Sequence, residues 1–460
     1  MKTTKKIFAA LLAVMMIALM IPFTASAAET NTLILNGKTG YTFTLYKVAG
    51  VNTTTGEYTD ITSGLESILT TKATNGVDSA ALLTACNGLS LTGGTDYAFA
   101  TGDSLTKTIA NLADGVYYLK VKSAPEGVNV TSVTNSVFAL PYYTDKTWIN
   151  EVTVNAADKI TDGTPTVSKK FTNNTTASSI SEFIGNDVSF TLTGSVVGST
   201  TEKAKSYQFV DTMSAGLTYN ALTSVNLVKA DGTKTDITSS VTYAKTGTTD
   251  NSFTLTIDPT LLATDAFYSN VSVEAVYTAT VNTGAVIGGN GNPNSVDLTY
   301  TNSYDQTSTI EGPEVKVFTF DLTVVKVDAS NTATKLSDAG FTLYTDNACT
   351  SVATNGDEVV TGTDGTATFS GLKAGTYYLK ETTAPAGYNI NSTVYTIVIS
   401  DTGAVTSNGT TVTQVEVGDT PLVTPKTGGV GTMMFTIGGA ALIACAGVLF
   451  LIVRKKKSAK

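Results

Sequence analysis

The stretch Lys373–Gly387 reads KAGTYYLKETTAPAG, and it has a close counterpart earlier in the chain. Residues 113–127 read ADGVYYLKVKSAPEG. Each copy follows a similar upstream pattern, GYTFTLYK from Gly40 and GFTLYTD from Gly340. Internal similarity of this kind indicates repeated structural units. The first and last domains of the chain are therefore expected to be related.

Short runs rich in Thr, Val, Tyr and Phe fill the body between Gly, Asn and Asp turns, as in DVSFTLTGSV, SVEAVYTATV and STVYTIVIS. Such runs predict β-strands, because β-branched and aromatic side chains suit a pleated, half-buried surface. Strands at this spacing favour antiparallel sandwiches. The sequence therefore predicts an all-β fold of three tandem Ig-like β-sandwich domains, with a helical excursion near Gly64–Leu83.

The N-terminal segment has the three parts of a secretory signal peptide. Lys2, Lys5 and Lys6 precede a long apolar run, and small residues lead up to Ala27. We expect cleavage between Ala27 and Ala28. A retained membrane anchor is the alternative, and the small-x-small pattern argues against it. The chain is therefore expected to be exported.

A second apolar run, Met433–Val453, has about 21 uncharged residues, which is long enough to cross a bilayer. The basic segment Arg454–Lys457 follows it and should stay inside by the positive-inside rule. A plain tail anchor would explain both features. It would not explain the sequence TPKTGG at Thr424–Gly429, just upstream.

The composition favours a non-catalytic body. The chain has no histidine, which excludes Ser-His-Asp and Cys-His catalysis and histidine metal ligands. Cys445 lies in the apolar run, and Cys86 and Cys349 lie in different predicted domains. We therefore expect the latter two to be buried thiols rather than a disulfide. No cofactor or metal site is predicted.

The mature chain is strongly acidic. The sequence has 29 Lys and Arg against 38 Asp and Glu. Three of the basic residues lie in the signal peptide and five follow Thr427, so 21 remain against 38, a net charge of −17. Such a surface argues against nucleic acid or an anionic membrane as a partner.

The C-terminal arrangement resembles the cell-wall sorting signal of Gram-positive surface proteins, in which Leu-Pro-x-Thr-Gly, an apolar span and a basic tail occur in that order. Here the motif is Thr424, Pro425, Lys426, Thr427 and Gly428, with Thr in place of Leu. The resemblance implies that a sortase cysteine attacks the Thr427 carbonyl and releases the chain from Gly428 onward.

The strings DLTVVKVD, AGFTLY and YYLKETTAPAGY, within Phe318–Leu422, look like the Cna B-type domain of Gram-positive surface proteins, and the last also looks like the pilin E-box. The resemblance implies an autocatalytic isopeptide bond between Lys326 and Asp419, promoted by Glu381. Asp419 stands where Asn is commoner. The alternative for Lys326 is an ordinary solvated strand lysine, and alternation alone does not place it inside.

The strings PTVSKKF, FIGNDVSFTL, VDTMSAGLTY and VDLTYTNSY resemble the isopeptide-forming Cna A-type middle domain of pilins. Lys169 alternates with apolar neighbours, so it is favoured over Lys170 as the buried amine. The resemblance implies Asp211 as the promoting acid and Asn302 as the acceptor. Asn294 is the alternative acceptor, and we expect it in a loop.

The first domain is expected to lack such a bond. Val121 occupies the repeat position of Glu381, and the opening strand NTLILNG has no lysine before Asn36. TWINEVTVNAADK, ending at Lys159, resembles the pilin motif W-x-x-x-V-x-V-Y-P-K in its Trp and two Val residues, although Tyr-Pro is missing. The resemblance implies Lys159 as the polymerisation lysine. The alternative is an inert linker lysine.

Together these features resemble a sortase-assembled major (shaft) pilin. The resemblance implies a non-enzymatic subunit, joined head to tail through Thr427 and a lysine of the next subunit, and anchored in the cell wall as a fimbrium. Implied partners are a class C sortase, a housekeeping sortase, identical subunits, minor pilins and peptidoglycan. The expected parts are a signal peptide at 1–27, an N-terminal sandwich at 28–157, a middle domain at 158–317, a Cna B-type domain at 318–421, and a sorting signal at 422–460 with its span at 433–453.

Three other interpretations remain open. One is a minor basal pilin or a monomeric wall-anchored adhesin with the same domains. A second is a surface glycosidase, for which no pair of carboxylates forms a recognisable site. A third is a calcium-dependent adhesin using loops such as Asp158–Asp162, which are explained more simply as turns.

Overall fold

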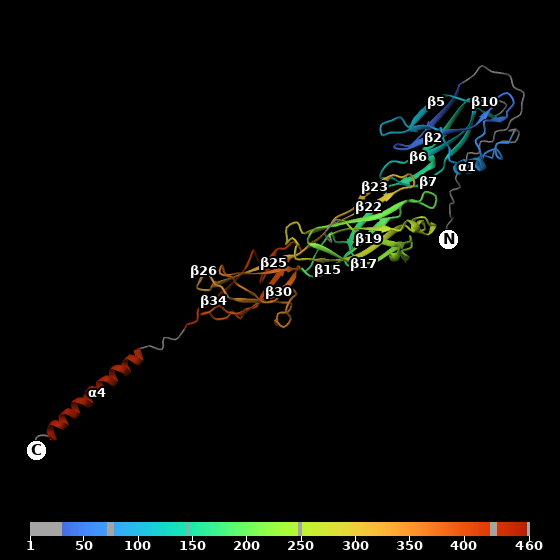
Figure 1. Ribbon diagram of the computed structural model, residues 1–460. Helices are drawn as coiled ribbons and strands as arrows, with labels where there is room; N and C mark the ends of the chain where they lie inside the picture. The colour runs from blue at the N-terminus through green and yellow to red at the C-terminus, as the bar shows by residue number, and fades with distance from the viewer. Residues whose placement is uncertain (1–29, 71–77, 145–146, 247–250, 424–429, 458–460) are drawn as a thin grey trace, which may run out of the picture. The chain divides into compact units, whose positions relative to one another are not determined.

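The computed structural model (Figure 1) describes residues 30–70, 78–144, 147–246, 251–423 and 430–457. The chain divides into two compact units between Thr319 and Phe320. The first unit holds two β-sandwiches with separate hydrophobic cores, and the second holds a third sandwich and a C-terminal helix. The predicted all-β fold of three tandem sandwiches is confirmed.

The first sandwich packs two sheets around apolar side chains such as Leu33, Phe43 and Leu119. One sheet has the order β11 (Glu151–Asn155), β1 (Asn31–Asn36), β5 (Thr106–Leu112). The other has the order β3 (Tyr58–Thr59), β2 (Thr42–Val51), β6 (Gly115–Ser123), β8 (Ser136–Leu140), with β4 (Thr95–Ala98) also on β2. Two small pairs are β9 (Tyr142–Thr144) with β10 (Thr147–Ile149), and β7 (Asn129–Val133) with β12 (Ile160–Gly163).

For the predicted helical excursion, the described residues contain one helix, which extends past the expected end at Leu83. Helix α1 spans Ser79–Asn87, and the Asp78 side chain accepts hydrogen bonds from its first free backbone N–H groups. Leu82 and Cys86 bury its inner face in a second small core of the first sandwich.

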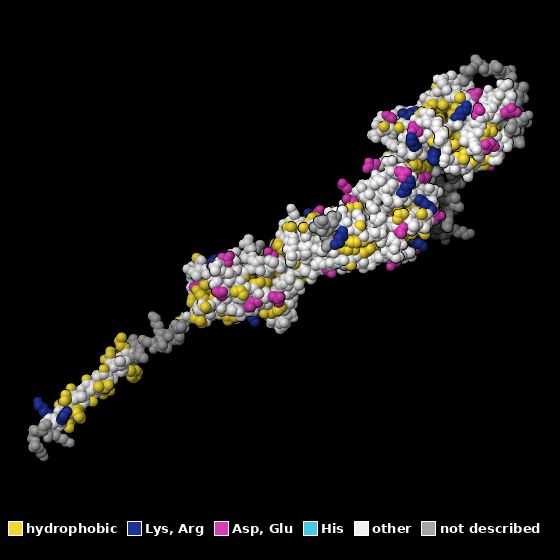
Figure 2. Space-filling model, viewed as in Figure 1, with side chains coloured by type: hydrophobic (Ala, Val, Ile, Leu, Met, Phe, Trp, Pro, Cys, Tyr) yellow, Lys and Arg dark blue, Asp and Glu magenta, His cyan; other side chains and the backbone are white. Residues whose placement is uncertain are grey.

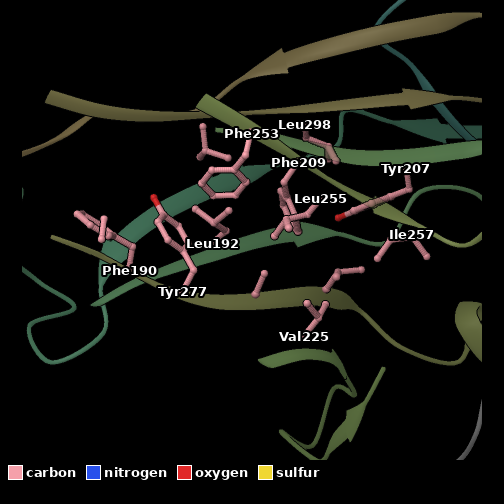
Figure 3. Packing of buried hydrophobic residues seen from close by; sticks show 14 of the residues in the cluster. Phe190, Leu192, Tyr207, Phe209, Val225, Phe253, Leu255, Ile257, Tyr277 and Leu298 are labelled. Atoms are coloured by element: carbon pink, nitrogen blue, oxygen red, sulfur yellow. The ribbon is translucent and has the colours of Figure 1, made fainter. Parts of the chain in front are cut away.

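The middle sandwich shows the clearest strand alternation, because successive residues point to opposite faces. One sheet has the order β13 (Val167–Phe171), β15 (Asp187–Ser195), β21 (Ser272–Val281), β17 (Leu217–Val228), β18 (Lys234–Asp236). The other has the order β14 (Ser179–Ser181), β24 (Val315–Phe318), β22 (Asn292–Thr301), β16 (Ser206–Met213), β20 (Ser252–Ile257), β19 (Val241–Lys245), with β23 (Thr307–Glu311) on β22. Short helical turns lie at α2 (Pro259–Leu262), α3 (Asp265–Tyr268) and η3 (Thr238–Ser240). Figure 3 shows aromatic and aliphatic side chains from both sheets meeting in this core.

The third sandwich repeats the strand pairing of the first. One sheet has the order β26 (Asn331–Lys335), β25 (Phe320–Asp328), β29 (Thr366–Leu372), with β34 (Val415–Asp419) also on β25. The other has the order β28 (Val359–Val360), β27 (Gly340–Tyr344), β30 (Gly375–Thr383), β31 (Tyr395–Ile399), β32 (Val405–Ser407), β33 (Thr410–Val412). The opening strand lies parallel to a late strand in both domains, as β1 with β11 and β25 with β34. Phe43 pairs with Val121, and Phe341 with Glu381. The repeat found in the sequence is therefore a repeat of structure.

The border between the first two sandwiches lies later than expected. Strand β12 pairs antiparallel with β7 of the first sandwich, with Ile160 opposite Val133. Lys159 and the residues up to Gly163 therefore belong with the first sandwich, although the sequence suggested a border after residue 157.

Helix α4 spans Val430–Lys457, and its segment Met433–Lys455 is long and apolar enough to cross a membrane. Its described side chains are exposed on all sides, and Figure 2 shows hydrophobic groups along the helix with basic groups at its end. A helix that is apolar all round needs an apolar environment. This fits the predicted span of the sorting signal.

Candidate functional site

The middle sandwich buries a lysine between its two sheets. Lys169 lies on β13, and alternation turns its side chain inward together with Phe171. Its Nζ donates to Asp211 Oδ2 of β16 at 2.6 Å, to the Ser295 carbonyl at 3.0 Å, and to Asn294 Oδ1 of β22. Lys169, Asp211 and Asn294 are almost fully buried. An amine, an acid and an amide from three strands thus meet in a dry core.

The structure brings Asn294, not Asn302, to the Lys169 amine, so the expected placement of Asn302 is wrong. Asn294 lies within strand β22 rather than in a loop. Asn302 follows the end of the same strand, where its Oδ1 accepts from the Tyr304 and Gln306 backbone N–H groups and closes a turn. Eight residues of strand separate the two asparagines, about 26 Å.

Burial dominates the electrostatics of this middle site. Desolvation lowers the pKa of Lys169 to about 8, although neighbouring Asp211 opposes that shift. Desolvation also raises the pKa of Asp211, against the effect of the Lys169 amine. The Phe190 and Tyr277 rings each lie 5.4 Å from Nζ. The lowered pKa of Lys169 raises the share of neutral amine, the form that attacks a carbonyl, and the raised pKa of Asp211 makes it a better proton acceptor.

Tyr277 belongs to the middle site, and sequence reasoning missed it. Its hydroxyl lies 3.0 and 3.1 Å from the two Asp211 oxygens, and it accepts from Asn294 Nδ2 at 2.8 Å. The available signal was the alternation SVEAVYTATV, which puts this tyrosine on the inward face of β21.

The third sandwich holds a second buried lysine. Lys326 of β25 donates from Nζ to Glu381 Oε2 of β30 at 2.9 Å, and also to Asp419 Oδ1 of β34. All three side chains are fully shielded from solvent. The structure therefore brings together the three residues expected here, and Lys326 is not a solvated strand lysine.

The two carboxyl groups of the third site share one cation. Desolvation raises the pKa of Glu381, and the nearby Asp419 charge adds to that effect. Glu381 Oε1 and Asp419 Oδ2 are buried without a hydrogen-bond partner among the described residues. Glu381 Oε2 also accepts from the Asn391 backbone N–H at 2.8 Å, a contact that the sequence did not reveal. Two buried acids beside a single amine favour keeping one acid protonated.

In the first sandwich, the positions that correspond to these sites are apolar. Val121, opposite Phe43, is buried where the repeat places Glu381. Leu33 and Leu35 fill the inward face of β1. The expectation that this domain forms no internal bond stays a prediction.

Lys159 lies in the short helical turn η2 (Ala157–Lys159), after β11, where Val152 and Val154 face inward. Its side chain is half-buried, and Nζ donates to Ser136 Oγ at 2.7 Å. Burial lowers the pKa of this amine. A partly desolvated amine has a larger neutral fraction than a surface lysine, which suits a nucleophile.

The nearby acidic loop is already occupied by a cation. Asp162 accepts from Lys38 Nζ at 2.6 Å and from the Tyr41 hydroxyl at 2.6 Å. In the described part of the chain, no three Cys, Asp or Glu side chains gather in a way that could hold a metal ion.

The remaining expected residues are placed as follows. Cys86 is buried, and burial raises the pKa of its thiol to about 11, whereas Cys349 is half-buried and so departs from expectation. The cleavage site at Ala27 and Ala28 and the sortase motif Thr424, Pro425, Lys426, Thr427 and Gly428 lie outside the described residues.

Fold and sites together define a class: a multidomain β-sandwich protein in which two domains each hold a buried lysine between an acid and a carbonyl-bearing acceptor. Residues 184–304 match the family model for the Gram-positive pilin backbone subunit 2, Cna-B-like domain. This description differs from the Cna A-type expected for the middle domain. Residues 320–413 match the SpaA prealbumin-like fold domain.

A similar protein sequence and two similar solved structures also come from Gram-positive surface proteins or pilins. The trypsin-resistant surface T6 protein of Streptococcus pyogenes is 28% identical over 244 residues, which is 46% of this chain and 42% of that protein. The chain thus spans less than half the length of that relative. The solved T6 backbone pilin of S. pyogenes superposes with a TM-score of 0.54 at 23% identity, over 82% of this chain and 81% of that one. The full-length major pilin SpaD of Corynebacterium diphtheriae gives 0.51 at 19% identity, over 86% and 98%.

Two domains of the chain match these family models, and its fold is similar to that of solved Gram-positive backbone pilins.

Proposed function

We propose that this protein is the shaft subunit of a sortase-assembled pilus, strengthened by two autocatalytic isopeptide bonds, Lys169–Asn294 and Lys326–Asp419. The observation that carries the proposal is the burial of each lysine amine against an acid and an acceptor carbonyl. No cofactor is needed, because the fold itself supplies proximity and desolvation.

In the middle domain, the neutral Lys169 amine attacks Cγ of Asn294, and ammonia leaves. Asp211, whose pKa is raised by burial, takes a proton from the amine and passes one on to the departing nitrogen. In the third domain, the Lys326 amine attacks Cγ of Asp419, and water leaves. Glu381, also with a raised pKa, passes the proton.

The bonds would close long loops. Lys326 and Asp419 are 93 residues apart, and Lys169 and Asn294 are 125 apart. By analogy with a disulfide, each closure contributes on the order of 4–5 kcal/mol. In the third domain the bond joins the parallel strands β25 and β34, so a pull on the chain ends cannot separate them. This suits a protein under tension.

For assembly, a class C sortase would cleave after Thr427 and hold the threonyl carbonyl as an acyl-enzyme. The Lys159 amine of the next subunit would then attack that carbonyl. A contact between different surfaces of two identical subunits does not close on itself, so it builds a filament. A housekeeping sortase would finally join the fimbrium to peptidoglycan, with minor pilins added.

The test is mass spectrometry of the Ala28–Thr427 chain and of its proteolytic peptides. We expect the calculated mass less one ammonia and one water, with cross-linked peptides containing Lys169 with Asn294 and Lys326 with Asp419. Asn294→Ala lacks the amide that would leave as ammonia, so its mass should be lower than calculated by one water only, whereas Asn302→Ala should still lose one ammonia and one water. The full calculated mass for the native chain would refute both bonds.

A minor basal pilin or a monomeric wall-anchored adhesin is the second candidate. One observation favours it: the Lys159 amine is half-buried and hydrogen-bonded to Ser136 rather than freely exposed. The two candidates differ in whether Lys159 is used for polymerisation.

A further inference from the structure

The Tyr277 hydroxyl lies between the acid and the acceptor of the middle site. It approaches both Asp211 oxygens, at 3.0 and 3.1 Å, and receives the Asn294 Nδ2–H group at 2.8 Å. The side chain is fully buried in the middle core, as Figure 3 shows. It is thus the residue that connects the acid to the nitrogen that must leave.

The directions of these hydrogen bonds orient the amide. An ionised Asp211 can only accept, so the single Tyr277 proton is donated to it. The phenolic oxygen then accepts from Asn294 Nδ2. The Asn294 carbonyl oxygen is consequently left to face the Lys169 amine, as observed. Without the hydroxyl, nothing at Nδ2 would distinguish the two ends of the amide.

We propose that Tyr277 is a catalytic residue of Lys169–Asn294 bond formation, which orients the amide and protonates the departing nitrogen. The inference rests on the proposed function. The Lys169 nitrogen bonds to Cγ of Asn294 and gives a proton to Asp211. The Cγ–Nδ2 bond breaks, and its electron pair stays on nitrogen. Tyr277 gives its proton to that nitrogen and regains one from Asp211, so ammonia leaves and no other reactant is consumed.

Another tyrosine of the same core provides a matched control. Tyr207 is also fully buried, but its hydroxyl donates only to the Ser195 backbone carbonyl, at 3.2 Å. Tyr207 lies apart from Tyr277 in Figure 3. Removal of either hydroxyl leaves a phenylalanine of nearly the same shape in the same core.

The test compares the full native chain with Tyr277→Phe and Tyr207→Phe, each made by cell-free synthesis with detergent. Timed samples are digested, and the cross-linked Lys169–Asn294 peptide pair is quantified by mass. We expect Tyr277→Phe to fold but to cross-link at least about tenfold more slowly, since general acid catalysis contributes that much or more. Tyr207→Phe should cross-link at the native rate.

Fluorotyrosine at position 277 separates chemistry from packing, because it keeps the shape and lowers the hydroxyl pKa. We expect the cross-linking rate at a fixed pH to change with the acidity of the hydroxyl, and this measurement stands even if Tyr277→Phe does not fold. If the native chain cross-links, an unchanged rate in Tyr277→Phe or in the fluorotyrosine chain would overturn the role of Tyr277 alone. A native chain that stays open at Asn294 would overturn the proposed bond as well.

Discussion

Lys169 is a residue whose burial makes sense only together with its neighbours. Burial of a charged amine costs several kcal/mol in lost hydration, unless an acid pairs with the amine or the amine loses its charge. Here Asp211 provides the pair, and desolvation still lowers the amine pKa to about 8. Conversion to an amide would remove the charge altogether. We therefore predict that replacement of the acceptor Asn294 changes how the free energy of unfolding depends on pH.

Asn294→Ala should leave a free Lys169 amine and make folding stability depend on alkaline pH. The folded pKa of about 8 lies below the unfolded value of about 10.4, so between these values the unfolded chain binds more protons. The free energy of unfolding should therefore rise from pH 8 to pH 10, by roughly 1–3 kcal/mol. Denaturant titrations at a series of pH values measure it.

The control for this dependence is Lys169→Met in the same Asn294→Ala background, which removes the titrating amine but keeps the volume. The free energy of unfolding of this double variant should not show the additional rise between pH 8 and pH 10. Equal slopes for the two variants would contradict a depressed pKa at Lys169.

At the residue scale, the alternation of side chains along a strand predicts which residues face inward. This prediction has limits. It identified Lys169 as inward-facing, but it could not choose between Asn294 and Asn302, because an even number of residues separates them and both face inward. The choice depends on register: β16 and β22 pair Met213 with Asn294 and Asp211 with Val296, which sets Asn294 beside the acid. For Lys326, alternation failed altogether, because Val324–Val327 are all buried.

At the scale of elements, the third domain depends on the pairing of its first and last strands. β25 and β34 run parallel, with Lys326 opposite Val417 and Asp328 opposite Asp419. Asp419 lies two residues after Val417, on the same inward face of β34. The Lys326 side chain, which starts opposite Val417, can therefore reach Asp419. One covalent bond there would fix the register of both strands.

Glu381→Gln should therefore leave β25 and β34 unjoined. The amide keeps the size of the side chain but cannot transfer a proton, so water should not be lost at this site. The third domain should then unfold more easily by about 4–5 kcal/mol. Calorimetry of the domain transition, together with peptide mass, measures both effects.

Glu416→Ala is the matched control, since Glu416 lies on the same strand β34 but is exposed. It should keep both the bond and the transition temperature. A Glu381→Gln chain that still loses water would contradict the role of Glu381 as proton carrier.

Strand patterns predicted the sandwiches because each inward face carries a regular run of apolar side chains, as in β21 and β22. Patterns could not predict that β12 joins β7, since that pairing depends on how the chain turns at Lys159. The role of Tyr277 could not be predicted, because its hydrogen-bond partners come from other strands, β16 and β22.

At the scale of the whole molecule, the three domains differ in their proposed roles. The second and third carry buried lysines, while the first has apolar residues at the related positions but carries Lys159. Lys159 is proposed to supply the amine that joins one subunit to Thr427 of the next. It is also held at Ser136, on a different strand of the same domain. Its role is therefore testable by itself.

Lys159→Ala should abolish the ladder of high-mass polymers in wall extracts, because it removes the amine proposed to attack the threonyl carbonyl of the neighbouring subunit. The monomer should stay folded, since loss of one half-buried hydrogen bond costs only about 1 kcal/mol. Lys170→Ala, at an exposed lysine of β13, is the matched control and should keep the ladder. Immunoblots of wall extracts make the comparison. An intact ladder in Lys159→Ala would favour the basal or monomeric alternative, or another lysine.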